Sequence, residues 1–319
     1  MKNKSFKVGL IGLGKMGQNH LRVLSMLKSV ELVFVYDVNQ EHAASLANNF
    51  NVIAAQDLDA VLPNVDAVVI CAPTVTHADY IRLAAKYVKN IFVEKPLTDT
   101  LAEAKVILTL ATELNLNIQV GFIERFNPAV VQMKKVLDKS HQVVSVDFTR
   151  TNKLSSRITD VDVVTDLMIH DIDLALHLNG PVKTVAAHGI RDGGMIGFAS
   201  ALLTHNNGRF SRILASRITE KKIRSIQATC TDMFVDCDLL RKEIIILRQS
   251  ELRQSEGEPY SISALEETVE VRPQEALLSE LQAFIGSCNG GKNIVPNVND
   301  GLNAMHICDQ IQNAVKLPC

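Results

Sequence analysis

Short apolar runs alternate with stretches of helical spacing through the first third of the chain. Leu21, Leu24 and Leu27, for example, recur at helical intervals after the first apolar run. A strand that is apolar along its whole length is typical of a parallel sheet covered by helices on both faces. The pattern therefore predicts an α/β fold with a doubly wound parallel sheet, with strands at residues 7–11, 31–36, 52–55, 67–71, 90–93 and 117–120.

The later residues no longer alternate in this way. Residues 121–128 are typical of a hinge-like connection, and Asn206, Asn207 and Gly208 form a hairpin turn signal. We expect an α+β domain with a large, mostly antiparallel sheet, covered by helices on one face and open on the other. Its strands are predicted at 143–150, 182–190, 196–204, 210–218, 223–229, 234–239 and 243–247, followed by a loop near 251–258 and helices at 274–287 and 300–315.

This change of pattern predicts two domains, over residues 1–121 and 122–298. A length of 319 residues is ordinary for two domains that each bury a core. The last helix, over about 299–316, is expected to pack back on the first domain. A second copy of the chain would cover the open face of the sheet, which predicts a homodimer or homotetramer.

The charge balance excludes several classes of partner. The chain has 33 basic and 35 acidic residues, so it offers no electrostatic reason to bind nucleic acid or a membrane surface. No apolar run approaches the roughly 18 residues of a membrane-spanning helix, and the first strand runs into a glycine loop, unlike a signal peptide. The six scattered cysteines lack zinc spacing, which predicts reduced thiols, no metal and a cytoplasmic protein.

A glycine motif separates the first predicted strand from the first predicted helix. In Gly12-x-Gly14-x-x-Gly17, the glycines permit a tight turn, close backbone approach to a pyrophosphate and close packing of helix on strand. Asp37 follows 20 residues after Gly17, where its carboxylate would accept ribose hydroxyls and repel a 2′-phosphate. These features favour a Rossmann domain that binds NAD rather than NADP. The alternative is a set of turn glycines with a solvated aspartate.

Other polar residues follow the fourth and fifth predicted strands. Ligands of open parallel sheets bind beyond the carboxyl ends of the strands, where Ala72, Pro73 and Thr74 are expected. Lys95 directly follows an apolar strand and directly precedes a proline, so it is a candidate for a reactive lysine in a cleft. A surface ion pair between Lys95 and Glu94 is the alternative.

A polar stripe crosses an otherwise apolar segment further along. Asp166, His170, Asp173 and His177 share one face at helical spacing, and a buried polar stripe requires partners. One interpretation is an acid/base pair in which Asp166 orients His170. A satisfied core histidine and a metal site are the alternatives, and the chain offers no second helix with matching ligands.

Two groups of basic residues accompany this stripe. Arg150, Lys153 and Arg157 lead into it and suit contacts to phosphate or carboxylate. A second cluster lies in the predicted sheet, where a solvated or inter-subunit face is the favoured interpretation and an anionic substrate the alternative. Its members are Arg209, Arg212, Arg217, Lys221, Lys222 and Arg224.

Five stretches, taken in order, resemble the motifs of the Gfo/Idh/MocA oxidoreductase family and span most of the chain. The set is far more specific than any single motif. The stretches are Gly12-x-Gly14-x-x-Gly17-x-x-His20, Ala72-Pro73-Thr74-Val75-Thr76-His77, Glu94-Lys95-Pro96, Gly121-Phe122-Ile123-Glu124-Arg125-Phe126-Asn127-Pro128 and Asp166-x-x-x-His170-Asp171.

The resemblance implies an NAD(P)-dependent dehydrogenase that acts on a sugar or cyclitol hydroxyl without a metal. Lys95 and His170 would form the catalytic pair beside Asp166, with His170 taking the hydroxyl proton and Lys95 stabilising the oxygen. The implied cofactor contacts are Gly12, Gly14, Lys15, Met16, Gly17, Asp37, Ala72, Pro73, Thr74, His77, Glu94 and Lys95. The implied substrate contacts are Lys95, Arg125, Asn127, Arg150, Lys153, Arg157, Asp166 and His170.

One departure bears on the substrate. Val161 and Asp162 stand where many members carry two glycines, and residues 162–171 are similar to the nucleotide-sugar branch of the family. Members of that branch oxidise the 3-hydroxyl of UDP-N-acetylglucosamine or its uronic acid. The alternatives are an inositol or free-sugar dehydrogenase, non-redox glycoside cleavage with bound NAD, and a non-catalytic NAD-binding regulator. The presence of both Lys95 and His170 argues against the regulator.

Overall fold

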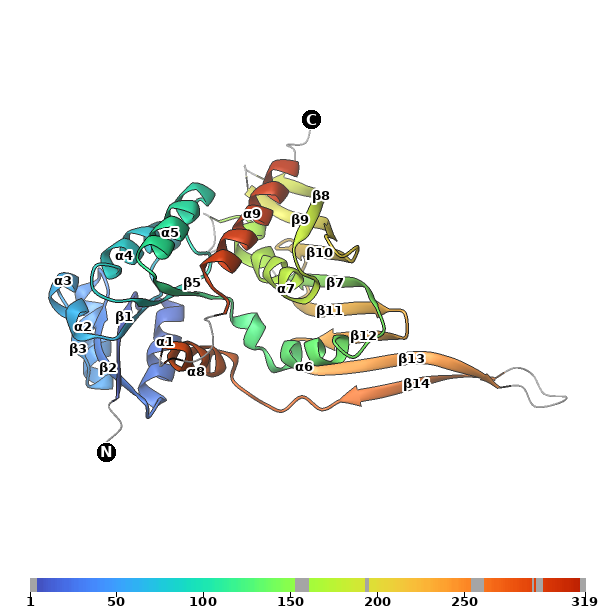
Figure 1. Cartoon of the computed structure of the whole chain (residues 1–319), viewed down its shortest axis with the longest axis horizontal. Helices are drawn as coiled ribbons and strands as arrows, with labels where there is room; N and C mark the ends of the chain where they lie inside the picture. The colour runs from blue at the N-terminus through green and yellow to red at the C-terminus, as the bar shows by residue number, and fades with distance from the viewer. Residues whose placement is uncertain are drawn as a thin grey trace. The chain divides into compact units, whose positions relative to one another are not determined.

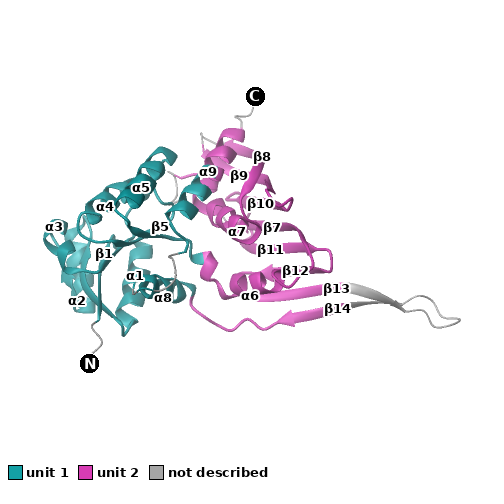
Figure 2. Ribbon diagram, viewed as in Figure 1, with its two compact units in different colours: residues 1–123, 276–306 teal, residues 124–275, 307–319 magenta. Residues whose placement is uncertain are grey.

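The computed structural model of the protein describes residues 5–152, 161–192, 195–253, 261–288, 290 and 295–315. The chain forms two compact units, coloured separately in Figure 2. Unit 1 comprises Met1–Ile123 and Ala276–His306, and unit 2 comprises Glu124–Glu275 and Ile307–Cys319. Figure 1 labels most of the helices and strands.

Unit 1 contains a six-stranded sheet in the order β3-β2-β1-β4-β5-β6. Every neighbouring pair of strands is parallel, which confirms the predicted doubly wound sheet. All four residues of β4 are buried, as its uninterrupted apolar sequence predicts. The strands are β1 (Phe6–Ile11), β2 (Val30–Tyr36), β3 (Ile53–Ala54), β4 (Ala67–Ile70), β5 (Asn90–Glu94) and β6 (Asn117–Gly121).

Helices pack on this sheet and complete its core. Helix α8 (Ala276–Cys288) contributes Leu281 and Phe284, which join Leu21 and Phe92 in one buried cluster. Helix α8 thus belongs to unit 1, whereas the sequence pattern assigned residues 122–298 to the second domain. The other helical segments are α1 (Lys15–Met26), α2 (Gln40–Phe50), α3 (Leu58–Val61), η1 (Leu62–Asn64), η2 (Thr74–Thr76), α4 (His77–Ala84) and α5 (Leu101–Glu113).

Unit 2 contains an eight-stranded sheet in the order β14-β13-β12-β11-β7-β10-β9-β8. Strands β7 and β10 are parallel, and the other neighbouring pairs are antiparallel, as expected. The predicted loop at 251–258 is wrong at its start, because β13 continues through Arg253 and β14 follows. The strands are β7 (Val143–Thr151), β8 (Val182–Asp192), β9 (Met195–His205), β10 (Phe210–Ser216), β11 (Ile223–Cys230), β12 (Met233–Asp238), β13 (Glu243–Arg253) and β14 (Ser261–Val269).

Helices cover one face of this second sheet. Helix α6 (Pro128–Leu137) packs on β12 and β13, and α7 (Ile169–Asn179) packs on β7 and β10. Along β9, Ala199, Ala201 and Leu203 are buried on the covered face, while Leu202 on the opposite face is 47% exposed. The sequence analysis treated the start of α6 as a connection, although Asn127 caps the helix and Pro128 occupies its first turn.

Helix α9 (Val298–Ala314) is shared between the units. In its first half, Gly301 lies close to Leu97 and Val120 of unit 1. In its second half, Gln312 Nε2 donates hydrogen bonds to Asp162 Oδ2 at 2.7 Å and Thr165 Oγ1 at 3.0 Å, both in unit 2. Each half of α9 therefore stabilises a different unit.

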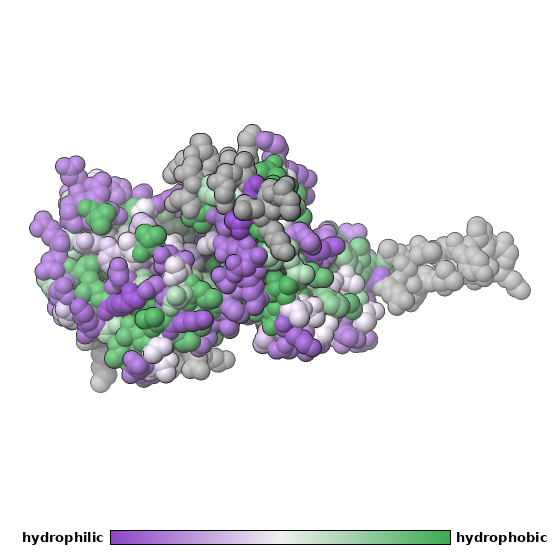
Figure 3. Space-filling model, turned by 90° about the horizontal axis from the view of Figure 1, so that it is seen from above, coloured by the Kyte–Doolittle hydropathy of each residue, from purple (hydrophilic) through white to green (hydrophobic). Residues whose placement is uncertain are grey.

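Figure 3 shows hydrophilic and hydrophobic residues interspersed over one face of the molecule. Among the residues that the structure describes, none of the helices has the length and apolar character needed to cross a membrane.

Candidate active site

The glycine loop between β1 and α1 has the geometry that the motif predicts. Gly12 has a φ of 89°, and a Cβ there would lie 2.5 Å from the backbone nitrogen of Ala72. A Cβ at Gly17 would lie 2.0 Å from the carbonyl oxygen of Gly12, so α1 packs directly on the loop. A Cβ at Gly14 would meet nothing within 4 Å, which leaves space on the side where a ligand would approach.

The N-terminus of α1 is suited to an anion. Gly14 is the N-cap residue and provides no side-chain cap, and the first turn contains no acidic residue. The first backbone N–H groups of a helix lack partners within the helix, and its dipole favours negative charge. Lys15 and Met16 are exposed beside these groups. The loop therefore fits the pyrophosphate of a dinucleotide.

Asp37 lies at the end of β2 and is held against this loop. Its Oδ2 accepts a hydrogen bond from the backbone nitrogen of Leu13 at 2.8 Å, and its Oδ1 accepts one from that of Asn39 at 2.9 Å. These two contacts fix the carboxylate beside the glycine loop. The geometry fits a ribose hydroxyl and disfavours the added negative charge of a 2′-phosphate.

His77 connects the loops that follow β4 and β5. Its Nδ1 lies 2.8 Å from the carbonyl oxygen of Pro96, and its Nε2 lies 2.9 Å from that of Ala72. Burial lowers the pKa of His77, although its contacts with the two carbonyls oppose this effect. The buried ring holds residues 72–74 and the loop that begins at Lys95 in a common arrangement.

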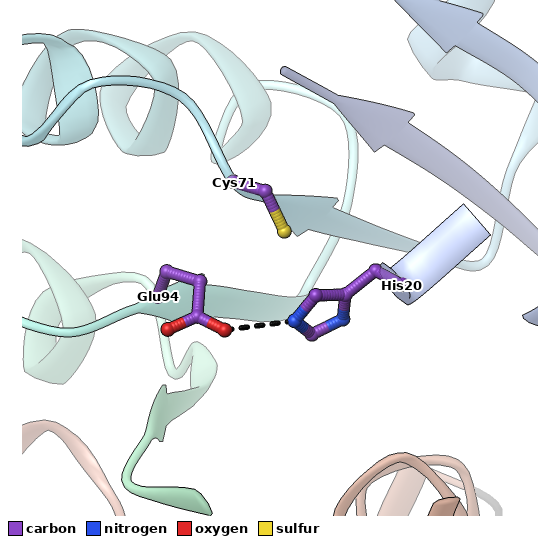
Figure 4. A group of neighbouring side chains, drawn as sticks. All are labelled: His20, Cys71 and Glu94. Atoms are coloured by element: carbon purple, nitrogen blue, oxygen red, sulfur yellow. Dashed lines mark hydrogen bonds and ion pairs between the residues drawn. The ribbon is translucent and has the colours of Figure 1, made fainter. Parts of the chain in front are cut away.

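Glu94 supports the backbone at Lys95. Figure 4 shows Glu94 beside His20 and Cys71, and Glu94 Oε1 lies 2.8 Å from His20 Nε2. Glu94 Oε2 accepts a hydrogen bond from the backbone nitrogen of Lys95 at 3.2 Å. Burial, with the nearby charges of Glu94 and Glu280, raises the pKa of the Cys71 thiol, so it stays protonated. The Glu94 carboxylate thus anchors the end of β5 from within the unit.

In unit 2, Asp166 lies on a π-helix (Val164–Met168) that leads into α7, so the predicted stripe does not follow one continuous α-helix. The Asp166 carboxylate accepts a hydrogen bond from Arg217 Nη2 at 2.7 Å, and Arg217 also donates to the Val161 carbonyl. His170 follows in the first turn of α7 and is partly exposed. This charged partner fixes Asp166 four residues before His170, and π-helical turns are frequent at functional sites.

Buried ion pairs anchor the rest of this region. Arg150 donates to Asp171 from Nε at 2.9 Å and from Nη2 at 2.8 Å, and to Glu124 from Nη1 at 2.9 Å. Its side chain is only 2% exposed, so this geometry does not support the predicted contact between Arg150 and substrate. Burial by itself would raise the pKa of Glu124, but the charge and hydrogen bond of Arg150 lower it.

Two further predicted substrate contacts have structural partners. Arg125 forms a two-pronged ion pair with Asp173 at 2.6 and 2.8 Å, which gives Asp173 a partner within the core. The Asn127 side chain caps α6 and donates to Glu124. Lys153 and Arg157 lie outside the described residues.

The predicted basic cluster does not form a single solvated face. Arg217 is buried against Asp166, Arg212 is largely exposed and contacts Asp147, and Arg224 shares the helix-covered face with Arg150. The sequence analysis missed Arg217 and Arg224 as neighbours of Asp166 and Asp171. Arg224 shares the two-residue period of the strand with the apolar Ile226 and Ala228. This spacing was the local signal that could have placed Arg224 on the covered face.

The model of the oxidoreductase family with an NAD-binding Rossmann fold, Gfo/Idh/MocA, matches residues 6–122. The model of the C-terminal domain of the same family matches residues 142–234. The chain belongs to the Gfo/Idh/MocA family. It is therefore an NAD-dependent dehydrogenase, and its cofactor is NAD.

The chain is similar to several named members of the family. It is 29% identical over 285 residues to UDP-N-acetylglucosamine 3-dehydrogenase of Acidithiobacillus ferrooxidans, covering 88% of each protein. A solved structure of that enzyme matches with a TM-score of 0.87 over 98% of both chains. Inositol 2-dehydrogenase of Rhizobium meliloti is 28% identical over 97% of this chain and 96% of its own length.

Proposed function

We propose that the protein oxidises a secondary hydroxyl of a sugar-type substrate, the 3-hydroxyl of a UDP-N-acetylhexosamine, with NAD as acceptor. The observation that carries this proposal is the pairing of Asp166 with Arg217 four residues before His170. That arrangement holds a carboxylate one helical turn before a histidine whose neutral form can accept a proton. The sequence of residues 162–171 and the similarity to UDP-N-acetylglucosamine 3-dehydrogenase support the choice of substrate.

In this proposal, His170 removes the proton from the reacting hydroxyl. Asp166 stabilises the imidazolium that results, and its contact with Arg217 keeps it in place. Lys95 hydrogen-bonds the same oxygen and stabilises the negative charge that develops on it. Bound NAD supplies the acceptor for the hydride that leaves the same carbon.

The proposed cofactor contacts follow the edge of the parallel sheet. The N–H groups at the start of α1 hold the pyrophosphate, and Asp37 accepts the adenosine ribose hydroxyls. His77 and Glu94 position the loops after β4 and β5 from within the fold. The residues proposed to touch NAD are Gly12, Gly14, Lys15, Met16, Gly17, Asp37, Ala72, Pro73, Thr74 and Lys95.

An inositol dehydrogenase is the second candidate. The similarity to inositol 2-dehydrogenase of Rhizobium meliloti, over nearly the whole length of both chains, favours it. The proposed chemistry at His170 and Lys95 is the same for both candidates, because each reaction oxidises a secondary ring hydroxyl. The two functions therefore differ in what surrounds the reacting carbon.

A turnover assay tests the function directly. Purified protein is mixed with NAD and UDP-N-acetylglucosamine, with myo-inositol and free sugars in parallel, and NADH is followed by absorbance. We expect NADH to form with the UDP-sugar, and more slowly when NADP replaces NAD because Asp37 repels the 2′-phosphate.

Faster oxidation of inositol than of any UDP-sugar would overturn the proposed substrate and favour the second candidate. Cleavage of a glycoside without net NADH would indicate non-redox use of the cofactor. NAD binding without turnover on any member of the panel would indicate a regulator.

We also propose that two copies associate through the face of the unit 2 sheet that its helices leave open. Ile190, Leu202 and Phe210 lie on this face and are 55%, 47% and 41% exposed. Apolar side chains on an open sheet face are typical of an interface between copies. Light scattering should show a dimer or tetramer, and Leu202→Glu should reduce the measured mass to that of a smaller assembly. A wild-type monomer at micromolar concentration would contradict the proposal.

The cysteines support a proposal for the compartment. Five cysteines lie among the described residues and are free thiols. We propose a cytoplasmic location, where thiols stay reduced, and cell fractionation would test it.

A further inference from the structure

Arg224 lies on the helix-covered face of the unit 2 sheet, directly opposite Arg150 on the neighbouring strand. Ile226 and Ala228, the next residues of β11 with the same orientation, are fully buried beneath the helices. Like charges directly opposite each other destabilise a sheet unless anions compensate for them. The two arginines therefore require negative charge on the same face.

The neighbouring carboxylates compensate the two arginines unequally. Asp171 and Glu124 accept three hydrogen bonds of 2.8–2.9 Å from Arg150. Arg224 has one loose ion pair, with its Nη1 3.6 Å from Glu124 Oε1, and no hydrogen bond from its guanidinium to any residue that the structure describes. The side chain of Arg150 is 2% exposed, and that of Arg224 is 33% exposed. Arg224 thus retains N–H donors that can reach a ligand.

The surroundings of Arg224 favour an anionic ligand. Burial and the charge of Arg150 lower the pKa of Arg224, opposed by Glu124, Asp171 and Asp166, and a guanidinium remains charged at neutral pH. A half-buried cation without strong hydrogen bonds carries a desolvation cost, which an anion would offset. Because Asp166 is near enough to act on this charge, the ligand would lie close to the proposed reacting hydroxyl.

We propose that Arg224 binds a phosphate or carboxylate group of the substrate, and that the enzyme selects anionic sugars over neutral polyols. This inference rests on the proposed function, since it places the anion next to the hydroxyl on which His170 acts. The planar guanidinium can bind two oxygens of a phosphate or of a carboxylate with parallel hydrogen bonds. Arg224 takes the role that the sequence analysis gave to Arg150, because the fold leaves it the more exposed and the less compensated of the two.

Steady-state kinetics at saturating NAD test the assignment. Wild type, Arg224→Gln and Arg224→Lys are compared on UDP-N-acetylglucosamine, its uronic acid, a hexose 6-phosphate and myo-inositol. On the substrates that use Arg224, Arg224→Gln should raise KM by about 10- to 100-fold with a smaller change in kcat, and Arg224→Lys should recover part of the loss. The substrate most affected identifies the source of the anion: the diphosphate, the uronic carboxylate or the sugar phosphate.

Arg241→Gln is the matched control. Arg241 lies between β12 and β13 of the same sheet, its side chain is 75% exposed, and its contacts with Asp238 and Glu243 are 3.8 and 4.0 Å long. This substitution should leave every kinetic constant unchanged. Thermal unfolding of each variant shows whether a kinetic change comes from lost folding instead.

The outcomes separate this inference from the proposed function. If the UDP-sugar is oxidised and Arg224→Gln has the wild-type KM, the role of Arg224 is overturned and the function stands. If only a hexose phosphate is oxidised and Arg224→Gln raises the KM for it, the proposed UDP-sugar substrate is wrong and the role of Arg224 stands. If no substrate is turned over, the binding of inorganic diphosphate is measured by calorimetry. Weaker binding by Arg224→Gln than by wild type supports the role of Arg224. Equal affinity of the two proteins, or no binding by wild type, overturns it.

Discussion

Replacing His170 by asparagine is expected to lower kcat by about 10²- to 10⁴-fold, the contribution typical of a general base. Asparagine has nearly the same size and polarity, but it cannot accept a proton at neutral pH. His170 belongs to unit 2 and the glycine loop to unit 1, so we expect the affinity for NAD to stay within about twofold of wild type. The measurements are initial rates of NADH formation and NAD binding by calorimetry.

Two further variants sharpen this test. His141→Asn is the control, because His141 is exposed and its described contact is a backbone hydrogen bond to Asp232, which the substitution keeps. Lys95→Met should also lower kcat, by about 10²- to 10³-fold, since it removes the donor that stabilises the developing charge. If His170→Asn retained more than a tenth of wild-type turnover while His141→Asn behaved as wild type, His170 would not be the general base.

Replacing Arg150 by methionine is expected to reduce the free energy of unfolding by about 3–5 kcal/mol. The substitution leaves Glu124 and Asp171 buried without the cation that donates to them and compensates most of their negative charge. A buried carboxylate without a partner is far less stable than an ion pair, although methionine fills a similar volume. Denaturant unfolding followed by circular dichroism measures the loss, and hydrogen exchange in peptides of β7 and β11 locates it in unit 2.

The loss at Arg150 should depend on pH. In wild type the pKa of Glu124 is lowered, so its contribution is present above the pKa of the unfolded carboxyl and is lost as the pH falls through the folded value. Without Arg150, burial raises the pKa of the same group, and the folded state loses stability as the pH rises above about 4. The difference between wild type and Arg150→Met should therefore be larger at pH 8 than at pH 5. Arg241→Met, which changes an exposed arginine, should show little loss at either pH.

An equal loss for Arg150→Met and Arg241→Met would show that the buried ion pairs contribute nothing specific to stability. A large loss without pH dependence would assign it to packing around the Arg150 side chain rather than to its charge.

The cofactor loop was determined largely by local sequence. Gly12 has the positive φ of a tight turn and Gly17 lies against the Gly12 carbonyl, as the local motif predicts, although Gly12 also packs against Ala72, which follows the neighbouring strand of the sheet. The strands of unit 1 were predictable for a similar reason, since a strand buried on both faces must be apolar throughout. The motifs around Lys95 and His170 could also be recognised in the sequence.

The partners of the charged residues were decided only by the tertiary structure. Arg217 and Asp166 are 51 residues apart, and Arg150 and Glu124 are 26 residues apart, so no local pattern pairs them. The position of α8 in unit 1 likewise depends on packing against helices and strands far earlier in the chain. Periodicity shows that a side chain alternates with its neighbours, but strand register and helix packing decide which carboxylate it meets. That is why the sequence identified arginines suited to an anion, and only the fold distinguished the compensated Arg150 from the more exposed Arg224.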